Sequence, residues 1–166
     1  MFDYYQLTVP VYTRTLNQLS HLISRAAEFA ETKKIGDEVI LGLRLAPDML
    51  PFVKQIQISC DNAKFAVARL AGVEAPKHAD HEASFIDLQH RINATLSFLE
   101  SVPRSAFKDA GTKTITLSFM PDKPMRADFY LLSFVTPNFY FHVNMAYALL
   151  RSNGVEIGKQ DYIGAI

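Results

Sequence analysis

The sequence predicts an all-α fold, an antiparallel four-helix bundle with a small β-hairpin between the third and fourth helices. Four long segments carry apolar residues at steps of three and four, which is the spacing of one helix face. One short segment shows the two-residue period of a strand instead. The composition is that of a globular chain, because 49% of the residues are hydrophobic and 20% are charged. The 166 residues fit a single domain, 1–166, without a linker or an internal repeat.

The first helix is predicted from about residue 5 to residue 30. Its apolar stripe consists of Tyr5, Val9, Tyr12, Leu16, Leu19, Ile23, Ala26 and Ala30. Pro10 either lies in the opening turns or kinks the helix, because proline lacks a backbone N–H. The break falls at Ile35, Gly36 and Asp37, and a short helical piece through Leu43 is expected to follow.

The second helix is predicted to begin near Asp48, since aspartate is a favourable N-cap. Pro51 would then lie in the first turn, where its missing N–H costs little. Gly72 is expected to end the helix. The apolar stripe comprises Phe52, Ile56, Cys60, Ala63, Val67 and Leu70. A thiol in the middle of such a stripe is more often inert than nucleophilic.

The third helix opens with a sequence close to a capping box. Ser84 is the expected N-cap, and Asp87 stands three residues later, where a glutamate is usual. Pro103 lies beyond the expected end of the helix. The inner face is formed by Phe85, Leu88, Ile92, Leu96 and Leu99.

A hairpin and a last helix complete the predicted fold. Residues 114–119 alternate polar and apolar side chains, which indicates a half-buried strand, and residues 120–124 supply the turn. The last helix is predicted over residues 128–152. Pro137 either starts a new helix there or kinks a continuous one and frees the carbonyl of Ser133.

His142 is the main candidate site residue, because helical spacing places it in the apolar seam of the last helix. Asn138 lies one turn earlier on the same stripe, which comprises Leu131, Val135, Asn138, His142, Met145 and Leu149. Buried polar groups need partners. Gln57 or Asp61 of the second helix would supply one if its flank faced the last helix. The spacing is equally compatible with a structural histidine and with a ligand pocket around His142.

Other polar groups carry less information. Tyr130 and Tyr147 are pocket candidates because their hydroxyls could donate hydrogen bonds to a ligand. The segment 78–82 (HADHE) has the composition of a metal cluster, but no further His or Cys stands at ligand spacing. We expect it to be a solvated loop.

Charge and cysteine content exclude several classes of protein. The 17 basic and 17 acidic side chains cancel, and neither sign forms a block, so no nucleic-acid partner is expected. The single cysteine cannot form an internal disulfide, and the N-terminus has no signal-peptide pattern, so a cytoplasmic location is expected. The apolar stretch 129–150 contains Ser, Thr, Asn and His and is expected to be a core helix, with no membrane partner.

Three groups of residues carry a family resemblance. They are 45–49 (LAPDM), the Gln55, Gln57, Cys60 and Asp61 set of the second helix, and 137–142 (PNFYFH) with the tail 153–162 (NGVEIGKQDY). Together they resemble an uncharacterised bacterial group of the DinB/YfiT-like superfamily, and the similarity covers nearly the whole chain. The resemblance implies a four-helix bundle of the DinB/YfiT-like type, often a homodimer.

The resemblance also implies a metal centre that this chain matches only in part. Many relatives bind a divalent metal through three histidines, one on the second helix and an H-x3-H pair on the last, and some are transferases or isomerases that use small thiols. Only His142 matches; Asn138 and Ala146 stand four residues before and after it. His142 is therefore a weak candidate for zinc or nickel, and loss of the metal is favoured.

Three functions are compatible with the sequence. One is a degenerate metal- or thiol-dependent transferase centred on His142. Another is a non-catalytic module that binds a small apolar ligand among the aromatic side chains. The third is an assembly protein that dimerises through exposed apolar helix faces. The sequence leaves open whether the chain is an enzyme, and no cofactor is favoured.

Overall fold

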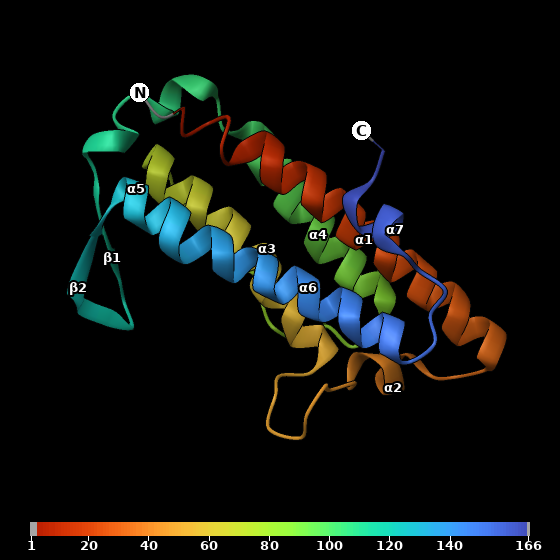
Figure 1. Ribbon diagram of the computed structural model, residues 1–166. Helices are drawn as coiled ribbons and strands as arrows, with labels where there is room; N and C mark the ends of the chain where they lie inside the picture. Colours follow the sequence, from red (N-terminus) through yellow and green to blue (C-terminus); the bar gives the residue numbers. More distant parts are fainter. Residues whose placement is uncertain (1–2, 166) are drawn as a thin grey trace.

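The computed structural model describes residues 3–165 and shows a mostly helical fold with one small antiparallel sheet (Figure 1). Four long helices lie alongside one another: α1 (Val9–Lys33), α3 (Phe52–Ala71), α4 (Phe85–Ser101) and α6 (Thr136–Ser152). Three short helices accompany them: α2 (Asp37–Leu41), α5 (Ala127–Phe129) and α7 (Lys159–Ile163). The helical class is confirmed, although the short helices go beyond a strict four-helix bundle.

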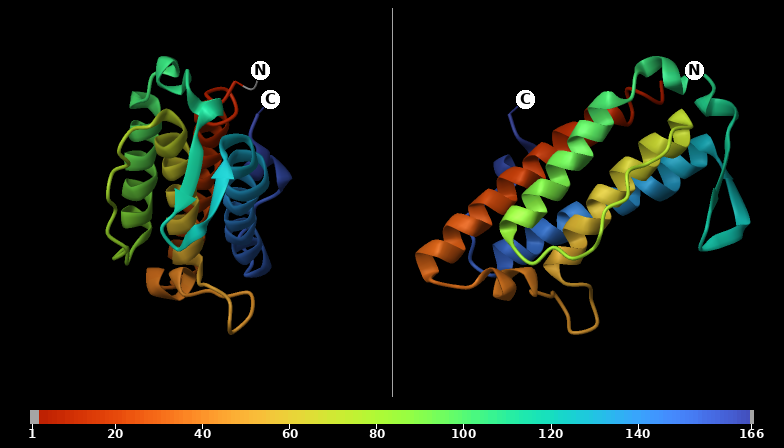
Figure 2. Two further views of the ribbon diagram at one scale, coloured as in Figure 1. Left: turned by 90° about the vertical axis from the view of Figure 1, so that its left-hand side faces the viewer. Right: turned by 180° about the vertical axis from the view of Figure 1, so that it is seen from behind.

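The predicted antiparallel arrangement is wrong for one pair, because α3 and α4 run in the same direction (Figure 2). The segment 72–84, which we name the strap, leaves the end of α3 and returns along it to the start of α4. An extended chain of 13 residues spans up to about 43 Å, whereas a 20-residue helix is only about 30 Å long. The strap is therefore long enough to make this return.

The core is formed by the facing sides of the long helices. Its largest fully buried side chains include Tyr12, Tyr130, Phe52, Phe139, Leu16, Leu19 and Ile56. α3 lies between α4 and α6 and has 13 buried residues among its 20. Such a helix buries more than one face, so polar side chains on different sides of α3 are all shielded from water.

The ends of α3 and α4 show how local sequence sets helix boundaries. Asp48 does not cap α3: Pro51 occupies the N-cap position with extended backbone, and the helix begins one residue later. This corrects the predicted start. Gly72 ends α3 with φ of 77°, which glycine adopts without steric cost. Ser84 caps α4 as predicted, because its Oγ accepts a hydrogen bond from the backbone N–H of Asp87 at 3.1 Å.

The last helix is continuous from Ala127 to Ser152 but contains a π-helical turn, Tyr130–Val135. The wider turn ends at Val135, two residues before Pro137, whose missing N–H leaves one carbonyl of the preceding turn without its usual helical donor. Thr136 does not cap a new helix, and its Oγ1 lies 2.9 Å from the hydroxyl of Tyr12. The last helix therefore does not start anew at Pro137; it continues through this position and widens into a π turn just before it.

The predicted hairpin is present between α4 and the last helix. β1 (Thr114–Leu117) pairs antiparallel with β2 (Met120–Arg126), and Ile115 lies opposite Met125. Two 3-10 turns, Arg104–Phe107 and Ala110–Thr112, lead into it. No helix of the described chain, 3–165, is long and apolar enough to cross a membrane.

Candidate functional site

His142 lies buried in the seam between α6 and α3, with 8% of its surface exposed. Its partner from α3 is Gln55, whose Oε1 lies 2.7 Å from the imidazole Nδ1. Gln57 and Asp61, the partners that the sequence suggested, lie elsewhere. The pair His142–Gln55 is therefore the polar centre of this seam.

The hydrogen bonds of Gln55 determine the tautomer of His142. Gln55 Nε2 donates to the carbonyl of Leu50 at 2.9 Å, which fixes Oε1 as the atom that faces the imidazole. Oε1 accepts only, so Nδ1 of His142 carries the proton and Nε2 keeps the lone pair. Burial lowers the pKa of His142 below its ordinary value of 6.5, so the ring is neutral at pH 7.

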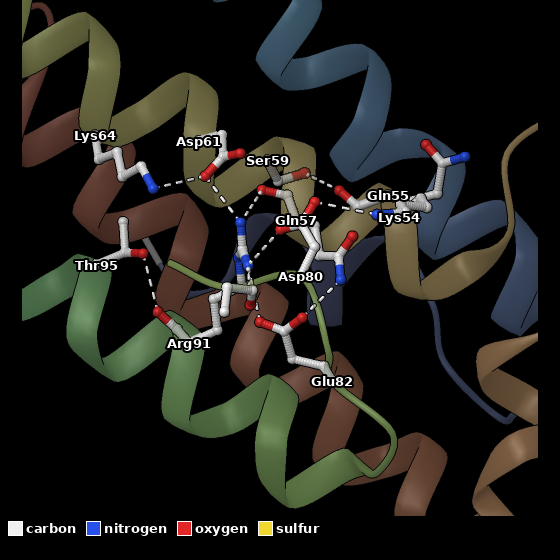
Figure 3. Close-up of polar contacts among 11 residues, drawn as sticks. Lys54, Gln55, Gln57, Ser59, Asp61, Lys64, Asp80, Glu82, Arg91 and Thr95 are labelled. Carbon is white, nitrogen blue, oxygen red and sulfur yellow. Dashed lines mark hydrogen bonds and ion pairs between the residues drawn. The ribbon is translucent and has the colours of Figure 1, made fainter. Parts of the chain in front are cut away.

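Gln57 and Asp61 belong to a second polar group, centred on Arg91 of α4 (Figure 3). The Arg91 guanidinium is 2% exposed and contacts three carboxylates. Nη1 donates to Glu82 at 2.8 Å and to Asp80 at 3.0 Å, and Nη2 donates to Asp61 at 2.8 Å. Gln57 Nε2 donates to the other oxygen of Glu82 at 2.6 Å. We name these residues the Arg91 cluster.

Two lysines complete the charge balance of the Arg91 cluster. Lys64, almost fully buried, lies 2.9 Å from Asp61, and Lys54 lies 3.1 Å from Asp80. Burial by itself would raise the pKa of Glu82, but the hydrogen bonds from Arg91, the backbone and Gln57 and the charge of Arg91 together outweigh it and hold that pKa below its ordinary value. Because each carboxylate has a cationic partner, the cluster can hold buried charge without a metal ion.

The segment 78–82 is not the freely solvated loop that we expected from the sequence. It lies in the strap, and its Asp80 and Glu82 bind Arg91. The ring nitrogens of His78 are also shielded from solvent. His81 remains exposed. The acidic residues thus anchor the strap to α4.

The other predicted site residues are dispersed. Asn138 is only partly buried and its Nδ2 donates to Oδ1 of Asn62 at 3.1 Å, so it does not reach His142 through a hydrogen bond. The Tyr130 hydroxyl accepts a hydrogen bond from Arg69 at 2.8 Å. Tyr147 packs edge-on against Tyr162 of α7, with ring centroids 5.8 Å apart. Each of these three predicted residues therefore has a partner other than His142.

Comparison with known proteins identifies the family. The family model described as "Domain of unknown function (DUF1993)" matches residues 4–163. The chain belongs to the DUF1993 family. A crystal structure of a DinB family member from Shewanella denitrificans is 40% identical, superposes with a TM-score of 0.93, and matches 98% of this chain and 92% of its own. The DinB-like resemblance of the sequence is thereby confirmed. A comparison with curated proteins gave no match.

The three-histidine metal set of DinB-like relatives does not fit this DUF1993 chain. Ala146 and Asn138 flank His142 on α6, and Gln55 faces it from α3. Within residues 3–165, no three His, Cys, Asp or Glu side chains converge as metal ligands would. The amide of Gln55 holds the imidazole of His142 in one orientation, as hydrogen-bond partners of ligand histidines do in metal sites. The other two histidines of the set have no counterpart at the matching positions of this chain.

The thiol of Cys60 is protonated and therefore no nucleophile in this DUF1993 chain. It is fully buried in α3, and burial raises its pKa to about 12. A thiol of this kind stays protonated at neutral pH and does not act as a nucleophile. Chemistry with a small thiol would therefore need an external thiol as well as a group to activate it.

An open apolar cleft lies between the hairpin and the beginning of the last helix. It has a volume of about 550 Å³ and is lined by Met120, Lys123, Pro124, Met125, Arg126, Phe129 and Phe134. We name it the hairpin cleft. His142 is not among its lining residues, so it is separate from the α3–α6 seam.

The sequence did not point to Gln55, Arg91 or the hairpin cleft. Gln55 is one of the residues that carry the family resemblance, and it lies two residues before Gln57. Arg91 follows the apolar Leu88 by three residues, on the inner face of α4, and this position is a signal that could have found it. A lone arginine on an apolar stripe requires buried acidic partners, and Asp80 and Glu82 were nearby in the sequence.

Proposed function

We propose that this DUF1993 protein, as a single domain over 1–166, is a non-catalytic module that binds a small apolar ligand in the hairpin cleft. The observation that carries the proposal is the lining of the cleft, in which two methionines and two phenylalanines provide most of the wall. Apolar walls with few polar groups are typical of small-molecule sites. Methionine side chains adapt to ligands of different shape.

The transferase alternative has weaker support. His142 donates through Nδ1 to Gln55, Cys60 is protonated, and the metal ligands of the relatives are not reproduced. Elemental analysis of protein purified without chelator tests this alternative. Stoichiometric zinc or nickel would overturn the non-catalytic proposal, and His142→Ala should then abolish the metal content.

Fluorescence titration with N-phenyl-1-naphthylamine, an uncharged apolar probe, tests the hairpin cleft. We expect saturable binding that weakens about tenfold or more in Phe129→Ser and Met120→Ser, since each removes an apolar wall worth about 1.5–3 kcal/mol when buried. Phe119→Ser is the matched control, because Phe119 is 69% exposed and does not line the cleft. Equal weakening by Phe119→Ser, or no saturable binding, would contradict the proposal.

A homodimer is a second candidate, favoured by the exposed outer side of the last helix. Phe129, Leu132 and Phe141 are 56%, 46% and 51% exposed, so the last helix presents three large apolar side chains to solvent. A helix face of this kind can pair with itself about a two-fold axis. Sedimentation velocity should show a dimer that dissociates in Phe141→Ser, which leaves the hairpin cleft intact. A monomeric wild-type protein would exclude this assembly.

A further inference from the structure

The hairpin cleft carries charge as well as apolar walls. Its lining contains two cationic side chains, Lys123 and Arg126, and no carboxylate. Both belong to β2, which extends from the start of the last helix (Figure 1). The neighbouring acidic residues, Asp122 and Asp128, are not part of the lining. A molecule in this cleft therefore meets positive charge from the hairpin together with apolar side chains.

Lys123 is the free charge of the hairpin cleft. Its side chain is exposed, and within residues 3–165 no hydrogen bond or ion pair engages its ammonium group. Arg126 differs, because its Nε and Nη2 donate to Asp128 at 3.2 Å and 2.7 Å. This geometry leaves the two N–H groups of its Nη1 available to a ligand. Since Asp128 offsets the charge of Arg126, Lys123 contributes one net positive charge to the lining, which favours a monoanion.

The π turn of the last helix brings two aromatic rings to the same cleft. Phe129 and Phe134 both line it, although they are five residues apart. In a regular α-helix residues five apart point about 140° away from each other. The i→i+5 hydrogen bonds of the π turn, Tyr130–Val135, bring them closer to one face. Phe134 also stacks on the buried Tyr130, with ring centroids 6.2 Å apart, so this wall is preformed.

The opposite wall of the hairpin cleft is adaptable. It contains Met120 and Met125, of which Met125 is buried and Met120 is half-buried. Methionine side chains are unbranched and adjust to the shape of a flexible partner. An aliphatic chain therefore fits between these side chains and the two phenylalanine rings.

We propose that the ligand of the hairpin cleft is a small amphipathic anion, such as a medium-chain carboxylate. Its head group accepts hydrogen bonds from Lys123 and from Nη1 of Arg126, and its chain packs between the methionine and phenylalanine walls. This inference rests on the proposed function and adds the charge and the shape of the ligand to it. The ligand is a single molecule rather than a lipid surface, because the cleft is a hollow of about 550 Å³ with only two cationic side chains in its lining.

Isothermal titration with octanoate and its relatives tests the proposal. Octanoate should bind with a dissociation constant of about 1 mM or tighter. The neutral octanamide should bind about fivefold more weakly at low ionic strength, because exposed charge pairs contribute modestly, and octylammonium should bind more weakly still. Hexanoate should bind about tenfold more weakly than octanoate, since it lacks two CH₂ groups worth roughly fourfold each when buried. Equal affinities for octanoate and octanamide, or for octanoate and hexanoate, would overturn the proposal.

Lys123→Met is the decisive variant. It should remove most of the preference for octanoate over octanamide and leave the affinity for octanamide unchanged, because methionine keeps the apolar stem of the side chain. Lys159→Met is the matched control, since Lys159 is exposed and does not line the cleft. It should keep the preference of the wild type. A preference that survives in Lys123→Met, or that both variants lose equally, would refute the assignment of the head group to Lys123.

Competition with N-phenyl-1-naphthylamine separates this inference from the proposed function. Octanoate should displace the probe. If the probe bound saturably and octanoate did not displace it, the apolar site would stand and the anionic ligand would be wrong; absence of binding by both would overturn both proposals. Vesicles of phosphatidylglycerol test the other source of negative charge. Cosedimentation with these vesicles that Lys123→Met abolishes, without binding of monomeric octanoate, would assign the cleft to a lipid surface and contradict the proposal.

Discussion

His142 shows what a single buried residue contributes at the level of hydrogen bonding. Its imidazole is held neutral by burial, and its only described polar partner is the amide of Gln55. In the unfolded chain the same ring titrates near pH 6.5. The folded protein therefore binds the proton less readily than the unfolded chain, and this difference links folding to pH.

We expect the free energy of unfolding to fall as the pH drops from about 7 to 5. Above pH 6.5 the ring is neutral in both states, so the contribution is fully present; below it the unfolded state gains a proton that the folded state still excludes. His78, whose pKa is also lowered, acts in the same direction. Urea unfolding at several pH values in this range should show that the free energy of unfolding changes less steeply with pH in His142→Gln than in the wild type.

His81→Gln is the control for this measurement, because His81 lies in the strap but is exposed. Its slope should match that of the wild type. The range stops at pH 5 because the paired carboxylates, among them Glu82, titrate below it. If His142→Gln and wild type lost stability in parallel, the depressed pKa of His142 would be excluded.

The partner of His142 could not be predicted because α3 is buried on two sides. Residues two apart in a helix point about 200° away from each other. Gln55 therefore faces α6 while Gln57 faces α4 and the strap, although both are 2% exposed. The apolar stripe of α3 indicates one inner face and does not show that the helix lies between two neighbours.

At the scale of single elements, two helix ends and the hairpin were predicted, whereas the predicted Asp48 cap of α3 is not formed. The sequence indicated the Ser84 cap, the Gly72 stop and the hairpin because each depends on local chemistry. The π turn at Tyr130–Val135 was not predicted, since Pro137 is compatible with a kink, a break or a wider turn. Thr136, which follows this turn, contacts Tyr12 of α1, and such tertiary contacts cannot be read from the spacing of apolar residues.

Ser84→Ala should lower the free energy of unfolding by about 1 kcal/mol, because it removes the acceptor for the Asp87 backbone N–H at the start of α4. The side chain of Asp87 also loses its hydrogen bond from Ser84. Ser97→Ala is the matched control: Ser97 is exposed in the interior of α4, where alanine favours the helix by a few tenths of a kcal/mol. Chemical denaturation of both variants measures the difference. Equal effects would show that the cap is not formed.

The molecule as a whole depends on the strap, which makes the parallel arrangement of α3 and α4 possible (Figure 2). The sequence shows that a connection of 13 residues, 72–84, separates the second helix from the third, but the length of this connection alone does not determine the direction of the third helix. The ion pairs of Arg91 with Asp80 and Glu82 hold the strap in its return path. These contacts join residues of the strap to α4, and Asp61 extends them to α3.

Arg91→Met should therefore destabilise the whole fold rather than one helix. It keeps the apolar volume but leaves the carboxylate of Glu82 nearly buried and without its ion-pair partner. Breaking a buried ion pair by removing one partner costs about 3–5 kcal/mol. Arg91→Lys should recover only part of this loss, because a single ammonium cannot reproduce the planar fork that contacts three carboxylates.

Two measurements separate loss of the strap from a general loss of stability. Urea unfolding gives the free energy, and trypsin cleavage after the exposed Lys77 reports whether the strap has left α3 in the folded protein. Arg104→Met is the control, since its ion pair with Asp3 is exposed and should contribute less than about 1 kcal/mol. In Arg91→Met, cleavage at Lys77 should accelerate more than cleavage within the helices, because the strap loses its anchor before the helices separate. Uniform acceleration at all sites would instead mean that Arg91 stabilises the bundle without holding the strap.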